Sequence, residues 1–543
     1  MVEQDRTRRR TFLGTAAAGA GLAAASLAQP REQTIAPAGV VTVAGLTAAH
    51  QQAVDRRRRI VVNYDALAHL FDYKSAAGVD GTEHVKKHLL RLLDRRGSQI
   101  DSVGWCWSEG NEAPYPSKVL PTLLDHPVFR RLPEGIDLVR ICCDETRKRG
   151  IESFFSLRIN GGDHDRGAAP KLPQKWGHKE RLINWNPDPD GPPEYISPYH
   201  KSAFWNFAAE GTRDLKIRAL REVAENYDFD GIEVDYARNS PVLPPGQQWE
   251  QREALTEFMR TLRRTLQQVA RQRGRPLLIG ARVPETVVGC HFDGIDIELW
   301  MRERLVDVLT LGCRTMEVDL ADFRRLADET GIKLYPCTDF VHKPDGYDPG
   351  MVTVGRGIYA NWWQQGADAV STFNYTYGGQ DWRLYEEIGS PETLRDKDKV
   401  FAIQRRGGGH SPVLTPYPNN WDTPRLAYAN TNLLGQLPVT LDPAGRADNL
   451  LFLSVADELA SGAAGLSTLK LRVGLSRSVP IEVRLNAGLL PAGKRDQNWV
   501  EFSPSPGLFA VGKNLVSVRH ARPAEADAEP VRIEKVELHV AYR

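Results

Sequence analysis

The segment best suited to chemistry covers residues 227–238 and reads YDFDGIEVDYAR. Ile232 and Val234 alternate in it with Glu233 and Asp235. Because successive side chains of a β-strand point to opposite faces, the apolar pair faces one side and the two carboxylates face the other. A pair of carboxyl groups on either side of the scissile bond is what glycoside hydrolysis requires, so these two acids are candidates for that chemistry.

The surrounding chain indicates a barrel that would position this strand. Between residue 56 and about residue 400, eight strand-like runs alternate with helical patterns, which is typical of an α/β fold of the (β/α)8 TIM-barrel type. In such a barrel the outer strand faces meet helices, so the acidic face would line the lumen and open at the catalytic end. The expected strands cover residues 60–65, 100–107, 153–160, 229–235, 277–283, 306–312, 333–337 and 368–375.

The same alternation predicts which polar residues line the lumen. Two arginines accompany three acids, and buried carboxylates need this near balance because an isolated ion in a low dielectric would take up a proton. One alternative is that the acids are only neutralised by these arginines and have no chemical role. Asn374 belongs to the set if Phe373 and Tyr375 face outward. The predicted lumen residues are Asn63, Asp65, Ser156, Arg158, Asn160, Glu233, Asp235, Arg282 and Asn374.

The candidate catalytic residues are Asp235, Glu285 and Glu233. Glu285 follows the fifth expected strand, at the rim where a proton donor to a leaving group can sit; the alternative is a solvated loop glutamate. Glu233 lies deeper than Asp235, so we expect it to pair with Arg158 or Arg282. Asp339, beyond the seventh strand, is a further candidate acid on the same rim.

Two tryptophans on the second strand are candidates for sugar stacking. Trp105 and Trp107 share one face of that strand, and aromatic faces at a barrel mouth stack well on the C–H surfaces of sugar rings. The alternative is ordinary core packing.

The third strand is followed by Asp163, His164 and Asp165, which could bind a metal. One histidine with two neighbouring acids is a weak metal signal, so we expect a sugar-hydroxyl-binding loop that includes His164, with no metal and no other cofactor. The sequence contains no Gly-x-Ser-x-Gly, P-loop or His-Glu-x-x-His motif, so acyl transfer, phosphoryl transfer and zincin chemistry have no support.

The N-terminus predicts export. Arg9 and Arg10 precede Thr-Phe-Leu and an alanine-rich run that ends at residue 28, which resembles a twin-arginine signal read by the twin-arginine export machinery. The expected location is therefore periplasmic or secreted, and the alternative is a basic tail. The apolar run is too short for a stable membrane anchor. Lysine plus arginine (70) nearly equals aspartate plus glutamate (69), so no nucleic-acid partner is expected.

The expected domains are a signal peptide (1–28), a linker (29–55), the barrel (56–405) and a C-terminal β-sandwich (410–543). The sandwich is predicted because short alternating runs with turn signals follow residue 409. These runs cover residues 450–455, 468–473, 481–485 and 531–540.

At residues 227–238, at Arg-Val-Pro (282–284) and at residues 296–309, the chain resembles the glycoside-hydrolase-like barrel proteins described as family 10-like glycosyl hydrolases. The resemblance covers about residues 56–400. It implies a (β/α)8 barrel that acts on poly- or oligosaccharides, with the aspartate at the end of the fourth strand, here Asp235, as a catalytic carboxylate. The segment is also similar to the chitinase pattern Asp-Gly-x-Asp-x-Asp-x-Glu, but Ala237 stands where that pattern has its catalytic glutamate.

The sequence therefore predicts an exported glycoside hydrolase with a carbohydrate substrate. Sugar, linkage, and a retaining or inverting outcome stay open. One alternative is a non-catalytic carbohydrate-binding barrel, which would keep the aromatic rim without an acid pair. The other is a metal-dependent hydrolase that uses Asp163, His164 and Asp165.

Overall fold

The structure of the protein is a computed structural model. All described residues belong to one compact unit, residues 40–543. The predicted export signal, the loop with Asp163, His164 and Asp165, and also Asn160 and Asn374 lie outside the described residues. The structure describes residues 46–66, 86, 89–108, 112–124, 135–159, 182–184, 203–237, 242–244, 247–313, 315–339, 347, 351–373, 381–405, 433–461, 465–524 and 528–543.

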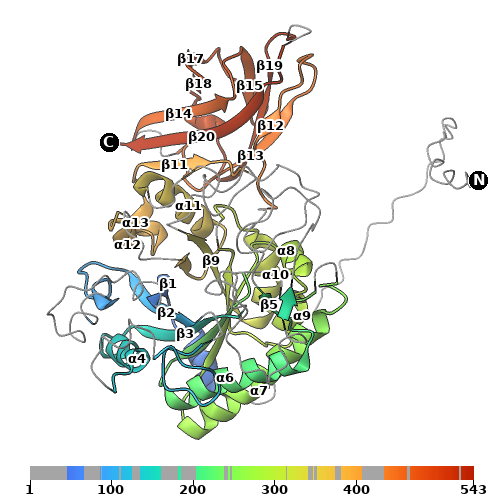
Figure 1. The fold of residues 1–543 in the computed structure, drawn as a ribbon. Helices are drawn as coiled ribbons and strands as arrows, with labels where there is room; N and C mark the ends of the chain where they lie inside the picture. The colour runs from blue at the N-terminus through green and yellow to red at the C-terminus, as the bar shows by residue number, and fades with distance from the viewer. Residues whose placement is uncertain are drawn as a thin grey trace, which may run out of the picture. The chain divides into compact units, whose positions relative to one another are not determined.

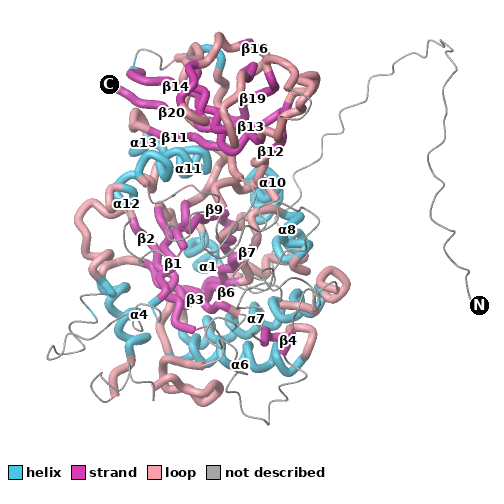
Figure 2. The backbone as a smooth tube through the Cα atoms, turned by 45° about the horizontal axis from the view of Figure 1, so that its top comes forward, coloured by secondary structure: helices cyan, strands magenta, loops and turns pink. Residues whose placement is uncertain are grey.

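Eight parallel strands form a closed barrel, as the sequence predicts (Figures 1 and 2). Each strand pairs with its neighbours in barrel order, and β10 closes the barrel on β1. A short antiparallel pair, β4 (Leu182–Asn184) and β5 (Ala203–Trp205), belongs to the long connection after the third strand. The barrel strands are β1 (Ile60–Asp65), β2 (Ile100–Ser108), β3 (Glu152–Arg158), β6 (Gly231–Asp235), β7 (Leu278–Val283), β8 (Val308–Leu311), β9 (Lys333–Asp339) and β10 (Val370–Phe373).

The long helices α6 and α7 lie outside the barrel strands, and helix ends follow capping chemistry (Figure 2). Asp137 and Thr286 accept backbone N–H groups at two N-termini, while Gly274 and Gly331 adopt positive φ just past two C-termini. Among the helices of the described residues, none is long and apolar enough to cross a membrane. The helices are α1 (Ala48–Val54), α4 (Leu138–Lys148), α6 (Glu210–Asn226), α7 (Arg252–Arg273), α8 (Val287–Phe292), α9 (Ile297–Arg302), α10 (Leu320–Thr330), α11 (Val352–Gln364), α12 (Leu384–Glu387) and α13 (Pro391–Leu394).

The N-terminal end of the barrel is filled by apolar side chains. Val54 of α1 packs there with Phe154, Leu278, Val308 and other buried residues. A Cβ at position 231 would lie 2.1 Å from the ring of Phe154, so glycine is needed at the start of β6. The carboxylates of β6 lie above this apolar layer, nearer the C-terminal ends of the strands.

The C-terminal part is a β-sandwich, as predicted. One sheet has the order β11-β20-β14-β18-β17 with β12 beside β20, and the other has the order β13-β19-β15-β16. The outer strand β11 precedes residue 405, where the barrel was expected to end, and still pairs with β20. The strands are β11 (Lys399–Ala402), β12 (Val439–Thr440), β13 (Asn449–Val455), β14 (Leu466–Leu475), β15 (Ile481–Leu485), β16 (Gly488–Leu489), β17 (Lys494–Asp496), β18 (Trp499–Phe502), β19 (Gly512–His520) and β20 (Arg532–Tyr542).

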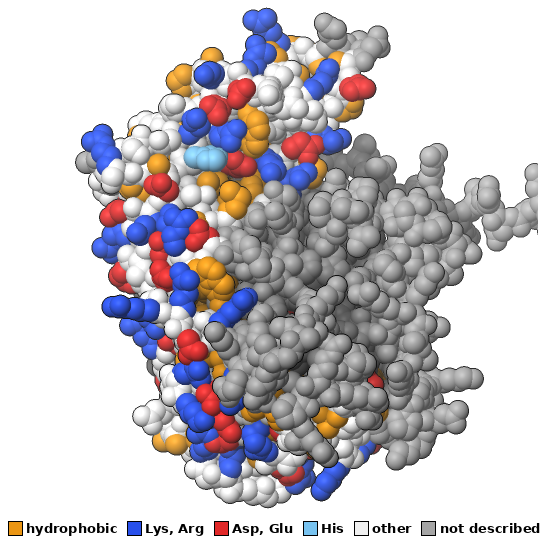
Figure 3. Space-filling model, turned by 60° about the vertical axis from the view of Figure 1, so that its left-hand side comes forward, with side chains coloured by type: hydrophobic (Ala, Val, Ile, Leu, Met, Phe, Trp, Pro, Cys, Tyr) orange, Lys and Arg blue, Asp and Glu red, His pale blue; other side chains and the backbone are white. Residues whose placement is uncertain are grey.

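Direct hydrogen bonds join the barrel to the sandwich. Asn361 of α11 donates from Nδ2 to the carbonyl of Ser454 in β13 at 3.1 Å. The fully buried Gln404 accepts at Oε1 from the backbone N–H groups of Met316 and Glu317, at 2.9 and 2.7 Å. Figure 3 shows basic and acidic side chains interspersed on one face of the described surface, in keeping with a net charge of +1.

Candidate functional site

Strand β6 places its two carboxylates in the barrel lumen, as the alternation predicts. Asp235 is in register with Arg158 of β3 on one side and with Arg282 of β7 on the other. Glu233 is one pleat deeper, and a Cβ at Gly104 in β2 would lie 3.7 Å from its Oε1. Because the residues of neighbouring strands meet at the same height, Asp235 lies between two arginines, whereas Glu233 lies between Ser156 and Gly280.

Glu233 is held by side chains from several strands. It accepts hydrogen bonds from Ser156 Oγ at 2.7 Å, from Thr310 Oγ1 at 3.1 Å and from Asn63 Nδ2 at 3.4 Å. Its Oε1 also lies 3.5 Å from Nη2 of Arg282, which confirms the expected ion pair with that arginine. These contacts fix the position of Glu233 and give its carboxylate both hydrogen-bond donors and a cation.

Asp235 and Arg282 form the centre of the site. Oδ1 of Asp235 lies 3.4 Å from Nε of Arg282, and both side chains are 0% exposed. Burial alone would lower the pKa of the Arg282 guanidinium, but the negative charges of Asp235 and Glu233 outweigh it and raise the pKa. Arg282 therefore stays charged and stabilises a negative charge on Asp235.

A second ion pair completes the set of three acids and two arginines. Arg158 donates from Nη2 to Oδ2 of Asp65 at 2.7 Å. Both arginines also lie against the buried ring of Phe373, with Cζ of Arg158 at 5.4 Å and Cζ of Arg282 at 4.1 Å from the ring centroid. Cation–π contact with one ring fixes the two guanidinium groups relative to each other.

Phe373 corrects one prediction. Asn374 was predicted to face the lumen if Phe373 and Tyr375 face outward, and Phe373 instead contacts the lumen arginines Arg158 and Arg282. A ring can replace a polar group there because two cations face it. Asn374 itself lies outside the described residues.

Two further acids lie at the C-terminal ends of their strands. Glu285 follows β7 and is only 1% exposed, so it is not a solvated loop residue. Its carbonyl accepts the N–H of Asp319 at 3.0 Å, which fixes the chain at this point. Asp339 is the fully buried last residue of β9 and is in register with Phe373. The C-terminal ends of parallel strands meet at one end of a barrel, so these acids and Asp235 share that end.

The prediction that Trp105 and Trp107 form a sugar-stacking surface is wrong. Both side chains are fully buried in the hydrophobic core, and Nε1 of Trp105 donates to Oγ1 of Thr146 on α4 at 3.1 Å. Gly104 is the residue of β2 that faces the lumen, so its neighbour Trp105 faces the helix layer. The large rings fill the space between sheet and helix.

Sequence reasoning missed several residues that shape the lumen. Gly104 and Gly280 leave room around Glu233, since a Cβ at Gly280 would lie 3.5 Å from Cβ of Glu233. Thr310 of β8 donates to Glu233, and the alternation of threonine with apolar residues in β8 was a usable signal. The glycines carry no chemical group that a sequence pattern could reveal.

The described residues contain no group of three or more His, Cys, Asp or Glu side chains placed to hold a metal ion. The candidate loop with Asp163, His164 and Asp165 is not among these residues, so the alternative that depends on it stays a prediction.

Comparison with known proteins gives similarity only to solved structures. No family model matches the chain. No curated protein matches it. The resemblance to family 10-like glycosyl hydrolases therefore stays a prediction.

Several of the similar solved structures are glycoside hydrolases. Alpha-L-fucosidase isoenzyme 2 from Paenibacillus thiaminolyticus is 18% identical at a TM-score of 0.39, over 62% of this chain and 48% of that one. The PgaB (BpsB) glycoside hydrolase domain from Bordetella bronchiseptica is 13% identical at a TM-score of 0.40, over 62% and 99%. The GH36 alpha-galactosidase AgaA from Geobacillus stearothermophilus is 12% identical at a TM-score of 0.34, over 91% and 58%. The chain thus spans about half the length of the fucosidase.

Proposed function

We propose that this protein is a glycoside hydrolase that cleaves glycosidic bonds in a poly- or oligosaccharide. The observation that carries the proposal is the buried contact between Asp235 and Arg282 at the C-terminal end of β6. Reacting groups of (β/α)8 enzymes occupy this end of the barrel, and a carboxylate kept negative there suits an oxocarbenium-like transition state.

In this proposal Asp235 acts as nucleophile or general base. Arg282 keeps it charged and oriented, and Glu233 holds Arg282 from below through the 3.5 Å ion pair. Glu285 is the proposed proton donor to the leaving group, because it is the buried acid that directly follows the neighbouring strand β7. Asn63, Asp65, Arg158 and Asp339 are proposed to contact the substrate or to orient groups that do.

The site supports a hydrolase better than a non-catalytic carbohydrate-binding barrel. A binding barrel was expected to keep an aromatic rim, and Trp105 and Trp107 belong to the core instead. Binding alone also has no need for buried acids, whose removal from water costs several kcal/mol per ion before pairing. The observed cluster keeps charged groups buried despite this desolvation cost. Such an arrangement is expected at a site where charge develops during a reaction.

A screen for reducing-end release tests the proposal directly. The purified full-length protein is incubated with defined poly- and oligosaccharides, with and without a chelator. We expect release from at least one glycan that is unaffected by the chelator. Release that needs a metal would favour the hydrolase that uses Asp163, His164 and Asp165. A glycan that binds without any release would favour the non-catalytic barrel.

We also propose that the enzyme acts outside the cytoplasm, on the basis of Arg9, Arg10 and the apolar run that follows them. A twin-arginine signal tolerates lysine poorly because a receptor reads the paired guanidinium groups. The double variant Arg9→Lys/Arg10→Lys should therefore accumulate in the cytoplasmic fraction. Equal export of this variant and the wild type would contradict the proposal.

A further inference from the structure

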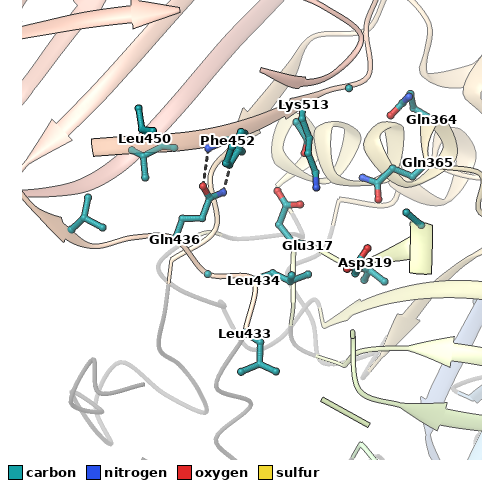
Figure 4. Close-up of a pocket in the computed structure, with 17 residues that line it drawn as sticks. Glu317, Asp319, Gln364, Gln365, Leu433, Leu434, Gln436, Leu450, Phe452 and Lys513 are labelled. Carbon is teal, nitrogen blue, oxygen red and sulfur yellow. Dashed lines mark hydrogen bonds between the residues drawn. The ribbon is translucent and has the colours of Figure 1, made fainter. Parts of the chain in front are cut away.

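A pocket of about 640 Å³ lies where the connection from β8 to α10 meets the β-sandwich (Figure 4). Its barrel side carries Glu317 and Asp319 of that connection and Gln364 and Gln365 at the end of α11. Its sandwich side includes β13 and the start of β19. The volume lies within the range of about 300–1,000 Å³ that is usual for small-molecule sites.

The walls of this pocket are held in place. The backbone N–H of Glu317 donates to Gln404, which is fully buried. On the other side, the side chain of Gln436 donates to the carbonyl of Phe452 at 2.8 Å and accepts its N–H at 2.7 Å. Because both walls are fixed by protein hydrogen bonds, a ligand would not have to order them.

Several polar side chains of the pocket have unused hydrogen-bonding capacity. Within the part of the chain that the structure describes, no hydrogen bond or ion pair engages the side chains of Glu317, Asp319, Gln364, Gln365 or Lys513. Figure 4 shows Glu317, Gln365 and Lys513 pointing toward one another across the pocket. Two carboxyls, two amides and one ammonium together offer donors and acceptors with little net charge, which suits a neutral ligand with many hydroxyl groups.

The electrostatics also favour a neutral ligand over an anion or a cation. Burial raises the pKa of the Glu317 carboxyl to about 7, and the charge of Lys513 offsets this only in part. A bound anion would meet Asp319 and a partly ionised Glu317, and a bound cation would meet Lys513. Hydroxyl groups can donate to the carboxyls and accept from the ammonium and the amides.

The sandwich wall adds an exposed apolar surface. Phe452 is 49% exposed and Leu450 is 59% exposed, and they lie two residues apart on the same face of β13. An aromatic face beside several hydroxyl-binding groups is the combination that fits a sugar ring, whose C–H surface stacks on the aromatic while its hydroxyls bind the polar groups.

The pocket is connected to the candidate active site. The N–H of Asp319, a pocket residue, donates to the carbonyl of Glu285, the proposed proton donor, at 3.0 Å. The connection that carries Glu317 and Asp319 also leaves β8 at its C-terminal end, where the candidate acids lie. A sugar chain bound in the pocket would therefore be near that end of the barrel.

We propose that this pocket is a second carbohydrate site that binds a neutral oligosaccharide beside the barrel mouth. Phe452 supplies the stacking surface, and Glu317, Gln365 and Lys513 bind hydroxyl groups. The choice of a carbohydrate as the ligand class rests on the proposed function. The geometry of the pocket is independent of that proposal.

Calorimetric titration of the full-length Asp235→Asn protein tests the proposal, because this variant should bind substrates without cleaving them. The probes are cellohexaose, xylohexaose, mannohexaose, maltohexaose and laminarihexaose. We expect at least one hexaose to bind, and Phe452→Ala in the same background to weaken the pocket affinity about tenfold or to reduce the stoichiometry from two to one. Gln365→Ala should weaken it less.

Leu489→Ala is the matched control, since Leu489 is 55% exposed in the same sandwich but does not line the pocket. It should leave every titration unchanged. Loss of binding in Phe452→Ala supports the pocket whether or not the wild type hydrolyses any glycan, so the two proposals can fail separately. Equal binding with and without Phe452, or no binding of any of the five hexaoses, would overturn the pocket proposal.

Discussion

Nε of Arg282 lies 3.4 Å from Oδ1 of Asp235, and the two side chains are completely buried on neighbouring strands at the same register. Neither charge reaches water, so each charge stabilises the other. The same guanidinium also serves Glu233 one pleat deeper. This relationship ties the stability of the barrel to the group proposed to do the chemistry.

The first prediction concerns that dependence. Arg282→Gln leaves Asp235 and Glu233 buried without their shared cation, so we expect the free energy of unfolding to fall by about 3–5 kcal/mol. Urea unfolding measures the change. The double variant Arg282→Gln/Glu233→Gln should recover part of the loss, because it removes one of the stranded charges. A loss below about 1 kcal/mol in the single variant would contradict the ion-pair account.

A second prediction concerns the two buried tryptophans. Trp105→Phe removes the hydrogen bond to Thr146 and some packing volume, so it should lower the free energy of unfolding by about 1–3 kcal/mol. KM for the glycan substrate should stay unchanged, because the ring faces α4. Thermal melting and steady-state kinetics separate the two effects. A large increase in KM at unchanged stability would restore Trp105 as a sugar-stacking residue.

A third prediction follows from the raised pKa of Glu317. Its pKa is about 7 in the folded protein against 4.5 ordinarily, so between these values the folded chain binds more protons than the unfolded chain. Stability from this group is therefore present below about pH 4.5 and is lost as the pH rises through about 7.

Glu317→Gln removes this dependence because glutamine does not titrate. The Tm of the variant relative to the wild type should be higher at pH 8 than at pH 5, as measured by differential scanning calorimetry. The same difference in Tm at both pH values would show that Glu317 does not carry a raised pKa.

A fourth prediction tests Glu285 as the proton donor. Glu285→Gln keeps the shape of the side chain but cannot give up a proton. The variant should therefore lose about 10²–10⁴-fold in kcat on glycosides with poor leaving groups and far less on activated aryl glycosides, which need no protonation. Equal losses on both kinds of substrate would assign Glu285 a structural role.

Local alternation predicted the parts of the fold in which one face of a strand is clearly apolar. In β6, Ile232 and Val234 identify the outer face, so the lumen position of Glu233 and Asp235 followed directly. All eight barrel strands were found within a few residues, because each is a short apolar run bounded by turn signals. A strand that is buried on both faces is still recognised as a strand, so all eight could be predicted.

The predictions of which residues face the lumen fail where both faces of a strand carry residues that are compatible with burial. In β2, Trp105 alternates with Gly104 and Cys106, and nothing local shows that the small residues face the lumen. In β10, Phe373 faces the lumen because Arg158 and Arg282 arrive from other strands. The burial of Glu285 likewise depends on the connection after β8. Such long-range contacts are not encoded in any local spacing.

The most direct test of the proposed function is the activity of Asp235→Asn on the glycan that the wild type cleaves. The substitution keeps volume and shape but removes the negative charge beside the sugar, so kcat/KM should fall roughly a thousandfold or more while the protein still melts cooperatively. Leu489→Ala, an exposed position of the sandwich that does not line the pocket, serves as the control and should keep the activity of the wild type. If Asp235→Asn retains turnover within tenfold of the wild type, Asp235 is not the reacting carboxylate and the assignment of this site is wrong.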